Sequence, residues 1–420
     1  MKDQTRSNLN LGAVFWNSAG SFASAAQSFV FLIAVTRVMG AEIAGDYSIG
    51  AAIAQLMWTV GLFDQSSFLV TDTEGRFTYE QYLSFKIFSC IVMVIGSILY
   101  VFSFGYSLEK SILALWLCAF KLVDAFAGYY YSVFQKFNRL DVSGFTMFVQ
   151  NITAMVVFVP SVVITRDVTL SVAFATVAMA VVTLGLYQLH LKEIEPIGSP
   201  DFSLAPLVDQ FFQLLPLFLG NFLYSYLANV PKYAIEHVGT NTLQTYFNVL
   251  FMPSFAINLC VRFFLRPAVT VLSTYWSEQN ISGFVGLIAK LLAGVVGVTA
   301  MFMFGAWLVG IPVLNFVFGV DLSEHVAVLV LLLFASGVMV AADVLFYPIV
   351  IFRKQIATVV TYGIALAFGY LLADGFVLSG GMIGASLVYF VEALIVLLLF
   401  LGITCYMVFK KNVLPTGGEA

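Results

Sequence analysis

Apolar stretches long enough to cross a lipid bilayer follow one another along almost the whole chain. A transmembrane helix needs about 20 mostly apolar residues. This pattern restricts the fold more than any other feature, and it predicts an all-α polytopic membrane protein of about twelve transmembrane helices. The expected spans cover residues 11–36, 43–70, 83–104, 110–134, 142–164, 168–189, 206–231, 242–264, 282–311, 326–350, 356–377 and 381–408.

The composition agrees with a membrane protein. Of the 420 residues, 61% are hydrophobic and only 10% are charged, whereas soluble domains carry about 25% charged residues. Twelve spans and their loops use the whole length, so no soluble domain is expected. The composition therefore excludes a soluble enzyme and a nucleic-acid-binding protein. The first apolar stretch is too long for a signal-peptide core, and we expect it to be the first spanning helix.

Lys and Arg are distributed unequally between the two sides of the predicted membrane. With the N-terminus in the cytoplasm, the outside segments carry Arg37, Lys110, Arg166 and Lys232. The inside segments carry Lys2, Arg6, Arg76, Lys86, Lys136, Arg139, Lys192, Arg262, Arg266, Arg353, Lys354, Lys410 and Lys411. This excess fits the positive-inside rule, so both termini are expected in the cytoplasm.

A weak internal repeat divides the spans into two sets of six. Residues 38–47, between the first two spans, align with residues 237–246, between the seventh and eighth, and share a Gly and a Tyr. Two parallel halves are typical of transporters whose substrate path lies between them. We expect pseudo-symmetric six-helix lobes at 1–190 and 206–409, a cytoplasmic linker at 191–205 and a cytoplasmic tail at 410–420.

Ionisable residues inside the spans are the main candidates for a functional site. Such a residue costs about 2.5–3.5 kcal/mol near the bilayer centre, so it tends to face a partner or a wet cavity. Lys121 and Asp124 are three apart and share a helix face, either as a self-neutralising pair or as part of a charged cavity or ion relay. Asp343 and Glu392 have no cation nearby in sequence, and either could bind a coupling ion.

Four cations are candidates for contacting an anionic group such as a diphosphate. Arg37 and Lys232 end the first helix of each half on the side where cations are scarce, so they would flank one cleft between the lobes; interfacial snorkelling is the alternative. Arg262 and Arg266 are four apart and share a face, and positive-inside anchoring is the alternative for them.

Three tyrosines, Tyr224, Tyr226 and Tyr233, are candidates for contacts with sugar rings, with packing or an interfacial belt as the alternative. The chain has no P-loop motif, no H-E-x-x-H and no paired Cys or His ligand set. We therefore expect no enzymatic activity, no catalytic residue and no metal site, and no cofactor other than a coupling H⁺ or Na⁺.

Several short segments in both halves carry a further signal: residues 36–40, 45–48, 134–141, 231–235, Tyr246, 251–258 and 264–267. Together they resemble the bacterial Wzx-type polysaccharide flippases of the multidrug/oligosaccharidyl-lipid/polysaccharide exporter superfamily. The Pro-Lys-Tyr sequence at 231–233 is the most specific of these segments. The chain departs from the pattern at Asp64, in a region where relatives often carry an Arg, so no cavity cation is expected from the second helix.

The resemblance implies an alternating-access flippase. Its substrate would be an undecaprenyl-diphosphate-linked oligosaccharide, moved from the cytoplasmic to the outer leaflet and driven by an ion gradient. It implies a bacterial cytoplasmic-membrane location, contact with membrane lipids, polysaccharide polymerase and assembly proteins as partners, and a monomer.

Three other functions stay open at this point. A multidrug or cation antiporter of the same superfamily would favour acidic residues in the N-terminal lobe, and the first helix has none between Leu11 and Val35. A membrane-embedded glycosyl transfer enzyme predicts a long external loop, which is missing. A non-transporting scaffold of envelope assembly would not need the cleft cations.

Overall fold

The computed structural model describes residues 11–72, 75–191 and 198–413, and the structural statements below refer to these residues. They form helices and connecting turns, with no strand in the described ranges. The chain divides into two compact units, Met1–Phe222 and Leu223–Ala420. We call these the N-terminal unit and the C-terminal unit. The division falls inside a helix, downstream of the linker predicted at 191–205.

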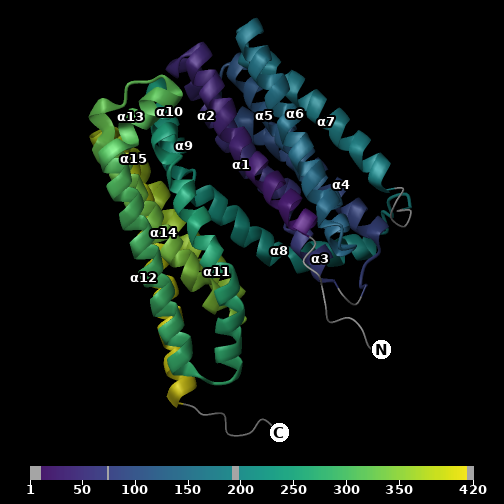
Figure 1. The fold of residues 1–420 in the computed structure, drawn as a ribbon, viewed down its shortest axis with the longest axis vertical. Helices are drawn as coiled ribbons and strands as arrows, with labels where there is room; N and C mark the ends of the chain where they lie inside the picture. Colours follow the sequence, from purple (N-terminus) through teal and green to yellow (C-terminus); the bar gives the residue numbers. More distant parts are fainter. Residues whose placement is uncertain (1–10, 73–74, 192–197, 414–420) are drawn as a thin grey trace. The chain divides into compact units, whose positions relative to one another are not determined.

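The described residues of the N-terminal unit form six long helices, one short helix and the first part of an eighth, which Figure 1 labels α1 to α8. In chain order they are α1 (Leu11–Met39), α2 (Ala41–Leu62), α3 (Gln65–Thr71), α4 (Tyr79–Ser103), α5 (Leu108–Lys136), α6 (Leu140–Thr165), α7 (Val168–Leu191) and α8 (Leu204–Leu227). Helix α1 packs along α6, and α2 packs on α4 and α5. The Phe31 and Phe158 rings, stacked with centroids 3.8 Å apart, join α1 to α6.

The C-terminal unit is built around the buried helix α14. Its helices are α9 (Val230–Val238), α10 (Asn241–Phe251), α11 (Ser254–Ser277), α12 (Ile281–Gly305), α13 (Ile311–Phe318), α14 (Val326–Ile351) and α15 (Gln355–Val413). A π-helical turn, Ala306–Gly310, joins α12 to α13, and a 3₁₀ turn, Ser323–His325, precedes α14. Helix α14 contacts α10, α11, α12 and α15. Because neighbours cover it on several sides, its own sequence is apolar on nearly every face.

The count of twelve spans is confirmed. Eight described helices are long and apolar enough to span a bilayer, or nine if the bent pair α8–α9 is one span. Helix α15 is two helices joined at Gly381, whose φ of 54° and ψ of −128° suit only glycine. The segments α2 and α10–α11, which carry charged residues, complete twelve spans in two sets of six.

The prediction of one continuous helix over residues 43–70 is wrong. The chain breaks at Phe63 and Asp64, which both have positive φ. The carbonyl groups at the end of α2 find donors elsewhere: Lys86 Nζ donates to the Gly61 oxygen at 2.9 Å and to the Leu62 oxygen at 3.2 Å. From the sequence we expected Lys86 in a cytoplasmic segment. It is instead fully buried, and its ammonium group satisfies the backbone carbonyl groups at the end of α2.

Two further span boundaries differ from the prediction. The helix expected to end at 231 breaks after Leu227, bends by 45° and continues as α9 to Val238. The helix expected over 242–264 is divided into α10 and α11 and reaches Ser277. The repeat aligns the helix junctions well, since Gly40 follows α1 and Gly239 follows α9. The first helix of the N-terminal unit nevertheless has no break corresponding to that between α8 and α9.

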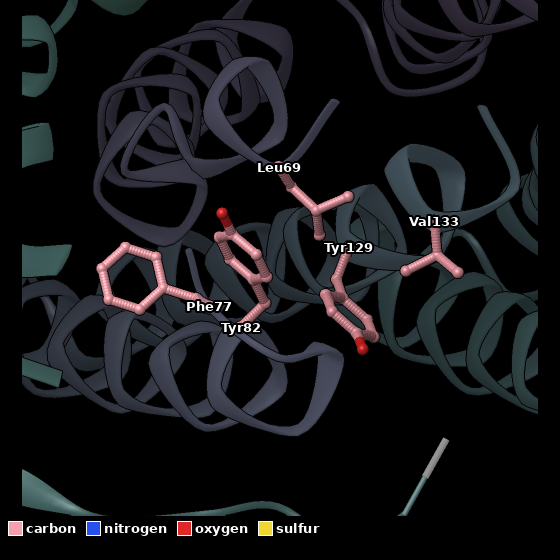
Figure 2. Close-up of a cluster of buried hydrophobic side chains, with 5 residues drawn as sticks. All are labelled: Leu69, Phe77, Tyr82, Tyr129 and Val133. Atoms are coloured by element: carbon pink, nitrogen blue, oxygen red, sulfur yellow. The ribbon is translucent and has the colours of Figure 1, made fainter. Parts of the chain in front are cut away.

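A buried cluster of mainly aromatic side chains packs against α3 in the N-terminal unit. Figure 2 shows Leu69, Phe77, Tyr82, Tyr129 and Val133, which come from α3, the following loop, α4 and α5. All five are buried. They fix the short helix α3 against the longer ones.

A carboxylate holds the loop beside this cluster. Asp72 accepts hydrogen bonds from the Arg76 backbone N–H at 3.0 Å and from the Tyr82 hydroxyl at 2.8 Å. Burial disfavours the charged form of Asp72. The hydrogen bonds from Arg76, Tyr82 and Phe77, with the positive charge of Lys136, outweigh burial and hold the pKa of Asp72 below its usual value.

Candidate functional site

A polar network crosses the interior of the N-terminal unit and is centred on Gln150 of α6. Its Nε2 donates to Asp124 Oδ1 at 3.2 Å. Its Oε1 accepts from the Tyr131 hydroxyl at 2.7 Å and from Thr183 Oγ1 at 3.1 Å. Side chains from α5, α6 and α7 therefore satisfy one another where water is scarce, and this network fixes the Asp124 carboxylate.

Lys121 lies on the same face of α5 as Asp124. Its Nζ lies over the Trp58 ring of α2, 5.5 Å from the centroid. Among the described residues no ion pair within 4 Å joins Lys121 to a carboxylate, although its charge still interacts with Asp124. The ammonium group is therefore stabilised by the face of an aromatic ring rather than by direct contact with an acid.

The C-terminal unit carries a second, half-buried acid site, centred on Asp343 of α14. Its Oδ2 accepts a hydrogen bond from the Tyr224 hydroxyl of α8 at 3.1 Å and from Asn258 Nδ2 of α11 at 3.4 Å. The charge of Arg262, one turn beyond Asn258, also acts on this carboxylate. Three helices thus converge on one acid, and the Tyr362 ring of α15 lies 5.6 Å from that of Tyr224.

Lys232 lies just beyond the break between α8 and α9. Its half-buried side chain places Nζ over the Phe251 ring of α10, 5.2 Å from the centroid. The described residues offer it no carboxylate within 4 Å. The Tyr226 and Tyr233 rings lie 5.4 Å apart across the same break. Because α9 continues to Val238, Lys232 lies within the broken span rather than at its end.

The three candidate arginines occupy different positions. Arg37 lies in the last turn of α1 and is exposed. Arg262 is exposed on α11. Arg266 belongs to the same helix, but its side chain lies outside the described part of the structure.

The remaining candidate, Glu392, is fully buried in the second half of α15. Neither carboxyl oxygen has a hydrogen-bond partner within the described part of the chain.

No group of three or more potential His, Cys, Asp or Glu ligands comes together within the described ranges. The four cysteines are all free thiols.

Two buried polar residues, Gln150 here and Lys86 at the break after α2, were not identified from the sequence. Gln150 carries no charge and so gave no signal, although it is the hub of the N-terminal network. Lys86 gave a signal that was assigned to the membrane surface.

The fold matches those of solved transporters. The chain aligns to an inward-facing multidrug resistance MATE family transporter of the MOP superfamily with a TM-score of 0.68 and 12% identity, over 94% of this chain and 96% of that one. An outward-facing structure of such a transporter gives 0.59 and 12%, with 96% of each chain covered. A MOP superfamily transporter from Pyrococcus furiosus, described as having a binding pocket of reverse polarity that suggests a different function, gives 0.60 and 12%, over 97% of this chain and 96% of that one.

No protein-family model matches the sequence, and no curated protein gives a significant match. The structural likeness establishes the fold, with twelve helices in two lobes.

Proposed function

We propose that this chain is an alternating-access flippase that moves a diphosphate-linked oligosaccharide lipid from the cytoplasmic to the outer leaflet of a bacterial membrane. Alternating access is supported by the fold, which transporters solved in inward-facing and outward-facing conformations share. The proposal places both termini in the cytoplasm, and it treats the chain as a monomer that works beside polysaccharide polymerase and assembly proteins.

One observation supports an anionic substrate. Each unit holds an ammonium group against an aromatic ring: Lys121 over Trp58 and Lys232 over Phe251. Neither ammonium forms an ion pair within 4 Å with any described carboxylate. A cation in a membrane span is costly, so it is kept where it meets a partner or a wet cavity. An ammonium group of this kind suits the phosphate oxygens of a lipid diphosphate, and in each unit the aromatic face holds it while the substrate is absent.

Residues of each unit are further proposed contacts for the substrate. Arg37, Arg262 and Arg266 are further proposed contacts for the diphosphate, since guanidinium groups bind phosphate oxygens in pairs. The paired rings of Tyr226 and Tyr233, and the ring of Tyr224, are proposed contacts for the sugars.

The test is leaflet assignment of a lipid-diphosphate oligosaccharide in proteoliposomes with a membrane-impermeant modifying reagent. We expect the native chain to expose the glycan and the Lys121→Gln, Lys232→Gln double variant to lose most of this exposure. The matched control is Lys290→Gln, which removes an exposed lysine of α12 and is expected to behave like the native chain. Equal activity of the native chain and the double variant would refute the assignment of these lysines.

Export of cationic drugs is the second candidate function. It is favoured by the two half-buried acids, Asp124 and Asp343, one in each unit. It predicts that proteoliposomes accumulate a cationic dye, that Asp124→Asn or Asp343→Asn abolishes this accumulation, and that the two lysines are dispensable.

A further inference from the structure

Glu392 is the most unusual ionisable group in the C-terminal unit. It lies near the middle of the second half of α15 and has no exposed surface. Neither carboxyl oxygen receives a hydrogen bond from any described residue. An isolated carboxylate is strongly disfavoured in surroundings of this kind, because burial removes its hydration and nothing replaces it.

The facing helix is shaped around this carboxyl group. Gly369 lies in the first half of α15, which folds back on the second half after the kink at Gly381. A methyl group on Gly369 would overlap Glu392 Oε1 and crowd the rest of the carboxyl group. The glycine therefore provides the space into which the acid projects.

Charged groups on the elements packed against this helix have other partners. On α9, the Lys232 ammonium lies over Phe251, and His237 contacts Asp374 at 2.9 Å.

The remaining ionisable groups also have contacts of their own. Glu236 of α9 has interactions of its own. Asp343 of α14 accepts hydrogen bonds from Tyr224 and Asn258. Among the described residues, Glu392 interacts electrostatically with Tyr389, one turn earlier on the same helix. No described cation lies within 4 Å to hold Glu392 in its charged form.

A proton satisfies this carboxyl group better than a metal ion does. Metal ions in proteins gather several ligands around themselves, and no cluster of three ligand side chains occurs in the described ranges. A neutral carboxylic acid needs no counter-charge, so its burial costs far less than burial of the anion.

We propose that Glu392 is a proton-binding site that is loaded in the described conformation and releases its proton when water reaches it. On release the carboxyl O–H bond breaks, the electron pair stays on the carboxylate, and the proton passes to water. As a coupling device this inference rests on the proposed transport function, whereas the presence of the bound proton does not.

Infrared spectroscopy of the full chain in lipid tests the proton directly and needs no substrate. The carbonyl stretch of a protonated carboxyl group is expected at neutral pH and is expected to disappear at alkaline pH. It should be missing in Glu392→Gln and retained in Asp343→Asn. An unchanged band in Glu392→Gln, or a band that Asp343→Asn removes, would overturn the inference.

A glycine pair keeps the test decisive if Glu392→Gln does not fold. Gly369→Ala displaces the carboxyl group, and we expect it to move the midpoint of the band's titration by about one pH unit or more. Gly363→Ala adds the same methyl group on the same helix where nothing lies within 4 Å, and it should leave the midpoint unchanged. Equal midpoints in the two variants would contradict the site.

The two proposals can fail separately. If glycan exposure occurs but depends neither on a pH gradient nor on Glu392, the coupling role is wrong and the flippase function stands. If the infrared band behaves as expected and no glycan moves, the flippase function fails and the proton site stands.

Discussion

Replacement of the buried Lys86 with methionine measures what holds the break between α2 and α3. Lys86→Met keeps most of the side-chain volume but removes the donor to the carbonyl oxygens of Gly61 and Leu62. Hydrogen bonds from a charged donor contribute about 1.5–3 kcal/mol each. The Gly61 oxygen keeps its bond from Ser89 Oγ at 2.9 Å, whereas the Leu62 oxygen loses this donor.

Two effects oppose each other in this variant. The lost hydrogen bonds destabilise the fold, and removal of a buried ammonium group relieves its desolvation. We expect the lost hydrogen bonds to dominate, because the buried backbone carbonyl groups remain in the variant and lose their donor. The expected net loss of stability is about 2–3 kcal/mol. For a unit of this size that corresponds to a fall in Tm of about 4–12 °C.

Thermal unfolding in detergent, followed by loss of the monodisperse chromatographic peak, provides the assay. The control Lys290→Met makes the same chemical change at an exposed position of α12, and its Tm is expected within about 1 °C of the native value. A Tm for Lys86→Met as close to native as that of the control would refute the reasoning.

Three further variants test other parts of the account. Gln150→Leu should lower stability by about 2–4 kcal/mol in the same thermal assay, because it leaves Asp124, Tyr131 and Thr183 without their shared partner; a neutral result would mean that the network is not formed. Gly381→Ala should cost about 1–3 kcal/mol, because its φ of 54° and ψ of −128° strain any side chain, whereas Gly375→Ala, where nothing lies within 4 Å, should cost nothing. The lowered pKa of Asp72 means that its contribution is complete above the unfolded pKa of about 3.9 and is lost as the pH falls through the lower folded value. Melting curves between neutral and acidic pH should therefore show a smaller acid-induced fall in Tm for Asp72→Asn than for the native chain, and identical falls would remove Asp72 from this role.

The number of helices and their division into two sets could be predicted because hydropathy is a local property of the sequence. Each apolar run marks a span whatever the rest of the chain does. The helix breaks could not be predicted in this way, since Phe63 and Asp64 adopt positive φ without the glycine that usually signals it.

The candidate site shows the same limit. Spacing alone placed Lys121 and Asp124 on one face of a helix. It could not supply the partners of Asp343, because Tyr224 and Asn258 are 119 and 85 residues away in the chain. The hydrogen bonds of Lys86 could not be predicted for the same reason, since their acceptors are backbone carbonyl oxygens of another helix.

A paired transport measurement decides whether the substrate is an anionic lipid-linked glycan or a cationic drug. One set of native proteoliposomes is assayed for outward exposure of a lipid-diphosphate oligosaccharide, and a second, matched set for accumulation of a cationic dye. We expect protein-dependent exposure of the glycan, reduced in the Lys121→Gln, Lys232→Gln double variant, and no accumulation of dye. Dye accumulation without glycan exposure would refute the proposed substrate.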